Sequence, residues 1–255
     1  MLEGKALVKS YSGIPAVNGV SFAIRPGEIL GYLGPNGSGK STTVKMLTGL
    51  MEPGSGQVLF RGRDIREDLT NYKRRLGYVP EEPNLYPYLS GKEYLELAGS
   101  LRGIPRALLH RKIAALLELF SISGSRFSPL QSYSKGMRQK VLIIAALLHD
   151  PDVLIFDEPL SGLDITAAGI FRNMVREMAR EGKTILYCSH VLEVVEKICT
   201  HVLILDHGNC VAHETVDRLR ESTALQTLEQ SFSHLVNEPD KELAAREMVA
   251  VMRWA

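Results

Sequence analysis

The residues best suited to chemistry lie in one glycine-rich segment near the N-terminus. Its sequence, Gly-Pro-Asn-Gly-Ser-Gly-Lys-Ser-Thr, has the phosphate-binding pattern G-x-x-x-x-G-K-S. The glycines let successive backbone N–H groups point inward, and the positive end of a following helix adds to their attraction for phosphate. The Lys40 ammonium can reach the β- and γ-phosphates, and the Ser41 hydroxyl can ligate Mg²⁺. The segment, called the phosphate loop below, predicts a nucleoside triphosphate site made of Gly34, Pro35, Asn36, Gly37, Ser38, Gly39, Lys40, Ser41 and Thr42.

Two adjacent carboxylates form a second candidate group. Asp157 and Glu158 directly follow the apolar run Val153 to Phe156, which has the composition of a buried parallel strand. Such a strand can bring Asp157 beside the phosphate loop, where it can hold Mg²⁺. Glu158 can then orient or deprotonate an attacking water. Together the two groups predict hydrolysis of the bound nucleotide.

The elements that must position these residues alternate between apolar runs and helical patterns. The apolar stretch Ile29 to Leu33 precedes the phosphate loop, and a run able to form a helix follows it. Thr166 to Glu181 has the pattern of a crossover helix between the strands Val153 to Phe156 and Thr184 to Tyr187. These features predict an α/β domain. Further expected elements are short strands within residues 2–30 with a turn at Gly13-Ile-Pro15, strands at Gln57–Phe60 and Leu76–Val79, helices from about Gly91 to His149, a hairpin at His201–Ala212 and helices after Thr215.

Length and charge narrow the class of protein. The 255 residues suffice for one large domain, or for a core with a small subdomain. The formal net charge of +1 gives no electrostatic case for a nucleic-acid partner. The longest clean apolar run, Val141 to Leu148, is far shorter than the roughly 18–20 residues that span a bilayer. With no signal-peptide pattern at Met1, we expect a soluble or peripheral protein.

The three cysteines are Cys188, Cys199 and Cys210. An odd number without a C-x-x-C pair argues against a disulfide framework and against a zinc site. We expect a reducing compartment and buried, structural cysteines.

With the further motifs Tyr133 to Met137, Ser161 to Asp164 and Cys188-Ser-His190, the chain resembles the nucleotide-binding subunit of an ATP-binding cassette (ABC) transporter. The resemblance covers nearly all of residues 2–220, in the family's motif order. It implies that Tyr11 stacks on adenine, that Ser134 and Gly136 of the signature segment (Tyr133–Met137) face the γ-phosphate bound by a partner chain, and that Asp164 crosses to that partner. It also implies that Asp157 and Glu81 hold Mg²⁺, and that Lys40, Glu158 and His190 are catalytic.

Two departures from the family's commonest pattern stand out. Lys135 and Met137 occupy signature positions where the family usually has Gly and Gln, and Glu81 stands where it usually has Gln. A carboxylate at Glu81 still ligates Mg²⁺ but adds negative charge near the γ-phosphate. The form Val-Pro-Glu-Glu-Pro and the late segment Leu228 to Phe232 resemble the bacterial branch that exports drugs, antibiotics and polysaccharides.

The resemblance further implies the fold and the partners. It implies a P-loop NTPase fold with a RecA-like, mostly parallel sheet, an antiparallel β subdomain and an inserted helical subdomain at about 88–150. The expected division is an ATPase domain at 1–220 and a helical extension at 221–255. The expected ligands are ATP and Mg²⁺, and the expected partners are a second ATPase subunit and a separate permease at the cytoplasmic face of the membrane, with no nucleic acid.

Several questions stay open at this stage. A non-transport ABC ATPase acting on nucleic acid, ribosomes or Fe–S assembly is the alternative function, and a regulator that binds ATP without turnover is a third; a GTPase is disfavoured because no N-K-x-D motif is present. The loop Glu82 to Tyr88 is either a permease-docking surface or a proline-rich connector. The stripe of Leu243, Ala244, Met248, Val251 and Met252 packs on the domain or meets a partner.

Overall fold

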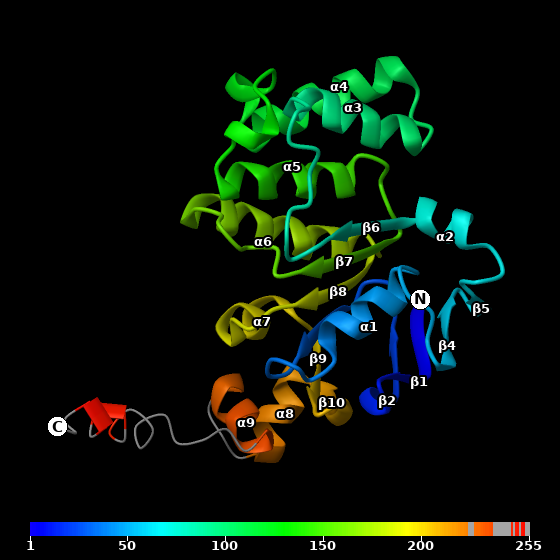
Figure 1. The fold of residues 1–255 in the computed structure, drawn as a ribbon, viewed down its shortest axis with the longest axis vertical. Coiled ribbons are helices and arrows are strands. Elements are labelled where there is room, and N and C mark those ends of the chain that lie inside the picture. Colours follow the sequence, from blue (N-terminus) through cyan, green and yellow to red (C-terminus); the bar gives the residue numbers. More distant parts are fainter. Residues whose placement is uncertain (224–226, 237–245, 247, 250, 253–255) are drawn as a thin grey trace.

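A six-stranded sheet forms the centre of the computed structural model, which describes residues 1–223, 227–236, 246, 248–249 and 251–252 (Figure 1). The strand order is β10-β9-β3-β8-β7-β6. From β9 to β6 the neighbouring strands run parallel, and β10 pairs antiparallel with β9. The mostly parallel core is therefore confirmed. The strands are β3 (Ile29–Leu33), β6 (Leu76–Val79), β7 (Val153–Asp157), β8 (Thr184–Cys188), β9 (His201–Asp206) and β10 (Asn209–Thr215).

Both faces of this sheet are covered, which explains its continuous apolar strands. Every residue of β3, β7 and β8 is buried. One face, including Phe156 and Tyr187, packs with α6 (Ile165–Arg180) and α7 (Leu192–Ile198). The other, including Ile155 and Leu186, packs with α1 (Lys40–Leu47). In Figure 1 these helices lie on opposite sides of the sheet.

An antiparallel sheet of order β2-β1-β4-β5 covers the far side of α1. Its strands are β1 (Leu2–Tyr11), β2 (Ile14–Ile24), β4 (Ser55–Phe60) and β5 (Arg63–Asp64). The expected turn at Gly13-Ile-Pro15 is wrong in extent, because Ser12 and Gly13 form the turn and Pro15 pairs with Ser10. A proline is tolerated there because β2 is the edge strand of this sheet.

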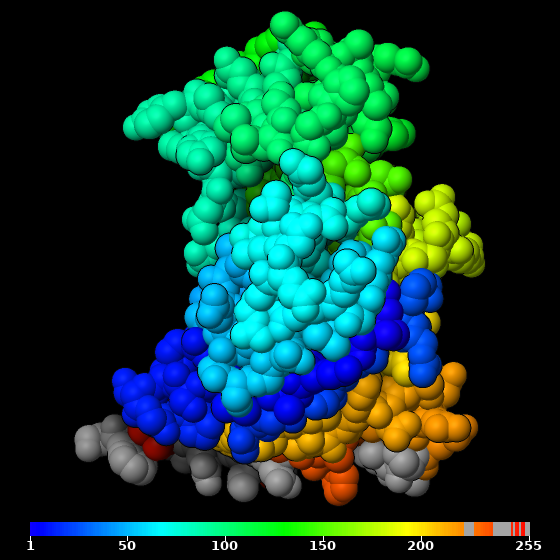
Figure 2. Space-filling model, turned by 90° about the vertical axis from the view of Figure 1, so that its right-hand side faces the viewer, coloured from blue at the N-terminus to red at the C-terminus, as the bar shows by residue number. Residues whose placement is uncertain are grey.

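Three helices form a lobe at one end of the molecule (Figure 1), called the helical lobe below. They are α3 (Gly91–Leu101), α4 (Arg106–Leu119) and α5 (Lys135–Leu147). Short 3₁₀ turns at Ser123–Ser125 and Leu130–Ser132 join α4 to α5, and α5 contacts β6. Figure 2 shows the segment around α2 (Leu69–Arg74), in cyan, between the green helical lobe and the blue antiparallel sheet.

Two helices, α8 (Val216–Thr223) and α9 (Leu228–Leu235), follow β10. Of the apolar stripe expected beyond them, Leu243 and Ala244 lie outside the described residues, and Met248, Val251 and Met252 are exposed. Within the described part of the chain, no helix combines the length and the apolar character needed to cross a membrane.

Two of the three cysteines behave as expected. Cys188 and Cys199 are buried, whereas Cys210 is exposed, so the expectation of a buried thiol is wrong there. The reason is position: Cys210 lies on β10, the strand at the edge of the central sheet.

Candidate nucleotide site

Four strands of the central sheet bring the predicted motifs to one edge. β3 leads into the phosphate loop, β6 into Glu81, β7 ends at Asp157, and β8 leads to His190. Because parallel strands end at the same edge, ligands of such sheets bind outside their carboxyl ends. A cavity of about 220 Å³ lies there, and its lining consists of Ala16, Asn36, Gly37, Gly39, Lys40, Ser41, Thr42, Glu81, Asp157, Glu158 and His190.

The phosphate loop has a conformation that its glycines permit. Gly39 has φ 105°, and a Cβ there would come within 2.2 Å of the Ala16 carbonyl oxygen. Gly39 is also the N-cap of α1 and offers no side chain to cap the helix, so the helix start faces the cavity uncapped. The Lys40 ammonium crosses the loop, donating to the carbonyl oxygens of Gly34 at 2.6 Å and Pro35 at 2.9 Å. Burial lowers the pKa of Lys40, and the nearby carboxylates of Glu158, Asp157 and Glu81 oppose that shift.

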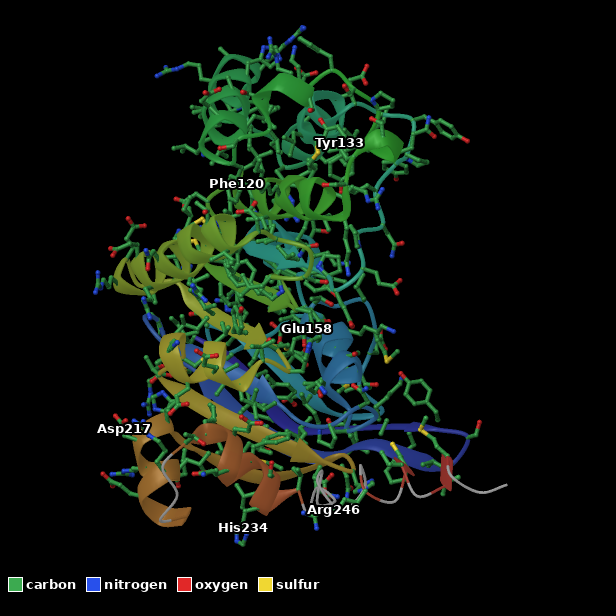
Figure 3. All side chains as sticks on the ribbon, turned by 90° about the vertical axis from the view of Figure 1, so that its left-hand side faces the viewer. Phe120, Tyr133, Glu158, Asp217, His234 and Arg246 are labelled. Carbon is green, nitrogen blue, oxygen red and sulfur yellow. The ribbon has the colours of Figure 1, made fainter. Side chains whose placement is uncertain are left out.

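Glu158 is held from several sides. Its φ of 47° is unusual for a residue with a side chain, and its N–H donates to the Cys188 carbonyl at 3.0 Å. One carboxylate oxygen accepts from the His190 N–H at 2.7 Å and lies 2.7 Å from His190 Nδ1. The other accepts from the Ser189 hydroxyl at 3.2 Å. Backbone strain and these hydrogen bonds therefore fix the orientation of the carboxylate. Glu158 lies near the middle of the molecule in Figure 3.

Asp157 lies among like charges. Its burial, with Glu81 and then Glu158 nearby, raises the pKa of this carboxyl to about 6. A divalent cation would offset both the repulsion and the loss of hydration. Hard carboxylate and hydroxyl oxygens are the ligands that Mg²⁺ prefers, so Asp157, Glu81 and Ser41 fit that ion.

Three residues of the phosphate loop, Gly34, Pro35 and Ser38, do not line this cavity, and four predicted site residues outside the loop do not line it either. The Tyr11 hydroxyl donates to the Met51 sulfur at 3.3 Å, and 46% of the Tyr11 residue is exposed. Ser134 caps α5 by accepting from the Met137 N–H. Asp164 caps α6 and lies 3.4 Å from Lys140 Nζ. Gly136 packs so tightly on the loop after β7 that a Cβ would lie 2.3 Å from the Gly162 carbonyl oxygen.

The two groups of predicted residues are therefore separate within one chain. In Figure 3, Tyr133 of the signature segment lies in the helical lobe, whereas Glu158 lies at the sheet edge. The chain brings together its phosphate loop, its paired carboxylates and His190, and it presents its signature segment elsewhere.

Sequence reasoning missed residues that support this site. Ser189 hydrogen-bonds Glu158, and its position beside His190 was the available signal. Gln139 is fully buried and donates from Nε2 to the Pro159 carbonyl at 3.1 Å, which ties α5 to the turn after Glu158. In the sequence, the position of this polar side chain near the start of an apolar helix was the available indication of its role. Ala16 lines the cavity, and no property of an alanine in the sequence marks it.

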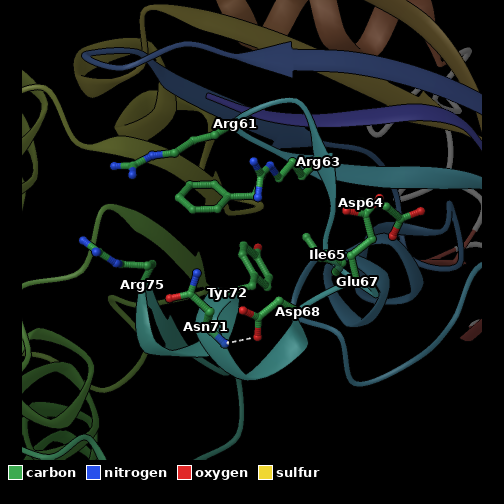
Figure 4. Close-up of a pocket in the computed structure, with 10 residues that line it drawn as sticks. Arg61, Arg63, Asp64, Ile65, Glu67, Asp68, Asn71, Tyr72 and Arg75 are labelled. Atoms are coloured by element: carbon green, nitrogen blue, oxygen red, sulfur yellow. Dashed lines mark hydrogen bonds between the residues drawn. The ribbon is translucent and has the colours of Figure 1, made fainter.

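A different cavity, of about 390 Å³, lies between β5 and α2 (Figure 4). Arg61 and Arg75 reach it and share Asp152, each at 3.2 Å from the same carboxylate oxygen. Asp64 is paired with Arg66 at 2.6 Å. None of its lining residues belongs to the motifs at the carboxyl ends of the central strands, so we do not assign the nucleotide to it.

Comparison with known proteins identifies the family to which this chain is similar. The family model described as ABC transporter matches residues 17–161. The chain is 38% identical over 220 residues to the ABC transporter ATP-binding protein NatA of Bacillus subtilis, covering 86% of this chain and 89% of that protein. It is 34% identical over 238 residues to the linearmycin resistance ATP-binding protein LnrL of Bacillus subtilis, covering 93% and 76%.

Among solved structures, an ATP-binding subunit of an ABC transporter matches with a TM-score of 0.87 and 34% identity, over 92% of this chain and 99% of that one. The fold, the cavity at the sheet edge and these relatives lead to one conclusion. The chain belongs to the ABC transporter family, as one of its ATP-binding, ATP-hydrolysing subunits.

Proposed function

We propose that this ATPase subunit powers a membrane exporter by closing and opening an ATP-dependent dimer. The observation that carries the dimer is the separation just described: the cavity holds the phosphate loop and its carboxylates, but not the signature segment. A second chain would supply Ser134, Gly136 and Asp164 to the ATP of the first, and the two sites would be related by a two-fold axis. The name of LnrL, a resistance protein, favours export.

The residues then have separate tasks. The loop residues Gly34 to Thr42 hold the phosphates through backbone N–H groups and Lys40. Ser41, Asp157 and Glu81 would hold Mg²⁺, which when bound neutralises charge on the phosphates. Glu158 accepts a proton from the attacking water, and His190 keeps Glu158 aimed while contacting the γ-phosphate.

The proposed function also includes contacts with the adenine ring and with a membrane partner. Tyr11, half exposed at the end of β1, stacks on the adenine ring. A separate permease holds the subunit at the cytoplasmic face of the membrane. We retain the division into an ATPase domain at 1–220, with the helical insertion at about 88–150, and an extension at 221–255; α8 runs across the boundary at residue 220.

Replacing Glu81 with Gln tests the proposed Mg²⁺ ligands. The variant loses one hard anionic oxygen, so the Mg²⁺ concentration for half-maximal ATPase activity should rise about 3- to 10-fold. The matched control is Glu82→Gln, the neighbouring exposed carboxylate, which does not line the cavity. Equal Mg²⁺ requirements in both variants would remove Glu81 from the ligand set.

The loop Glu82 to Tyr88 is the proposed docking surface for the permease. Tyr86 and Tyr88 are 63% and 83% exposed, whereas Leu85 packs against the core. Tyr88 is therefore the better probe, because replacing Leu85 would also disturb packing. Exposed aromatic side chains of this kind contribute strongly to protein interfaces.

We expect Tyr88→Ala to reduce transport in cells at least about fivefold while the purified subunit keeps its ATPase activity within about twofold. Leu119→Ala, which removes an apolar side chain from α4 that is 70% exposed, serves as the control. Transport and ATPase activity that both survive in Tyr88→Ala would contradict the docking proposal.

The alternative function, a non-transport ABC ATPase, has no support from the relatives compared above. Purification of tagged protein from membranes discriminates between the two. Recovery of an integral membrane protein favours transport, and recovery of ribosomal or nucleic-acid components favours the alternative.

A further inference from the structure

A larger cavity adjoins the nucleotide site on the side of His190. Its volume is about 550 Å³, and Asn36 and His190 line both cavities. One wall comes from Gly34 and Pro35 and from the segment Ser189–Val191, called the switch segment below. Another comes from Glu229 and Phe232 of α9. A helix that follows all the ATPase motifs in the sequence thus reaches the edge of the catalytic machinery.

The switch segment is tied on one side to Glu158, to which the Ser189 hydroxyl and the His190 N–H both donate. The His190 side chain is 78% exposed, and its ring contacts Glu158. The Val191 N–H donates to the Ser189 hydroxyl within the same segment. Helix α7 starts immediately afterwards without a side-chain cap. The position of His190 therefore depends on Glu158 on one side and on the start of α7 on the other.

Helix α7 packs on the central sheet and is held on two further sides. It contacts α6, where Arg176 Nη2 donates to the Lys197 carbonyl at 2.7 Å. It also contacts α9, and its buried Val194 and Val195 belong to the same apolar cluster as Leu228 and Phe232. Leu228 is fully buried and Phe232 is 7% exposed. Removal of the Phe232 ring would leave a void on that side of α7, beside Leu228, and weaken its packing.

Helix α9 is well formed enough to act as a support. The Thr227 hydroxyl accepts from the Gln230 N–H and the Gln230 side chain accepts from the Thr227 N–H, which completes a capping box. The Ser231 hydroxyl donates to the Thr227 carbonyl. Helix α8 packs against it as well. Caps alone stabilise a helix this short only in part, and packing against the domain supplies the remaining stability.

We infer that α9 positions the switch segment, with Phe232 as the positioning residue that sets the rate of ATP hydrolysis without taking part in ATP binding. The inference rests on the proposed role of His190. It adds a residue from the C-terminal part of the chain to those that determine the rate of hydrolysis. It predicts that changing this residue lowers kcat and leaves the phosphate loop unchanged.

The test compares Phe232→Ala with the unaltered full chain. We expect kcat to fall about tenfold, because a small displacement of a catalytic group costs much of its effect. KM for ATP should stay within about twofold, because the residues that bind phosphate are untouched. Hydrogen–deuterium exchange should rise in the peptide spanning residues 189–195 and remain unchanged in the phosphate loop.

Three further variants make the result decisive. Phe232→Leu keeps an apolar side chain but loses the ring, so kcat should fall only about two- to threefold. His234 lies on the exposed face of α9, at the lower edge of Figure 3. His234→Ala should therefore have the kcat and KM of the unaltered protein. His190→Ala is measured in parallel. If His190→Ala keeps full turnover, the proposed role of His190 fails.

The inference itself is overturned if His190→Ala is impaired while a folded Phe232→Ala hydrolyses ATP at the unaltered rate. It is also overturned if exchange rises equally in the phosphate loop, or if KM rises in step with the loss of kcat. Should Phe232→Ala not fold, Phe232→Leu decides: a faster exchange at residues 189–195 with a lower kcat and unchanged KM supports the inference, and unaltered values in all three overturn it.

Discussion

Glu158→Gln is expected to lower ATP turnover at least about 100-fold while ATP still binds. The amide keeps the shape of the carboxylate, and its oxygen can still accept the hydrogen bond from the His190 N–H. What the variant loses is the ability to take a proton from water. Phosphate release measures the turnover, and the binding of labelled ATP measures the affinity.

The same variant should accumulate as an ATP-bound dimer, because the step that would open the dimer is blocked. Gel filtration with and without ATP measures this shift. Glu177→Gln is the matched control, since its carboxylate is exposed on α6 and pairs with Arg180. Turnover in Glu158→Gln within about twofold of the control would contradict the catalytic assignment.

The sequence predicts the central site well because its signals are local. A strand that delivers a phosphate loop to a helix needs only neighbouring residues, and β3, the loop and α1 follow in that order. Asp157 ends an apolar strand in the same way, and Glu158 directly follows it. Since parallel strands share one carboxyl edge, local patterns were enough to predict that these groups meet.

The conformation of Glu158 could not be predicted, because it depends on contacts distant in the chain. Its positive φ is accompanied by hydrogen bonds to Cys188, Ser189 and His190, about thirty residues later in the sequence. A positive φ at a residue with a side chain costs on the order of 1–3 kcal/mol, which surrounding structure must offset. No single-residue preference indicates where this occurs.

The contact of α9 with α7, which follows the switch segment, was equally hidden. Leu228 and Phe232 have the spacing of an ordinary buried helix face, and a sequence pattern does not say which partner such a face will meet. The turn before β2 shows the same limit. Pro15 suggested a turn by its type, but its place on an edge strand was decided by sheet order.

Gly136→Ala is expected to have the largest effect of any substitution outside the nucleotide cavity. The new Cβ would lie 2.3 Å from the Gly162 carbonyl oxygen, so either the start of α5 or the loop before Asp164 must move. We expect turnover to fall about 100-fold, because a shift of about 1 Å in a positioning element can cost that much. ATP binding should persist, because Gly136 does not line the cavity.

The effect of Gly136→Ala on dimer formation is best measured in the Glu158→Gln variant, where the ATP-bound dimer should accumulate. Adding Gly136→Ala should abolish the ATP-dependent dimer on gel filtration while each chain still binds labelled ATP. Adding Gly169→Ala is the matched control, because a Cβ at this helical glycine meets nothing closer than an Arg172 side-chain nitrogen at 3.9 Å. If both double variants form the dimer equally well, the signature segment does not close over the partner's ATP. If only the Gly136 variant stays monomeric with ATP bound, the site is shared between two chains.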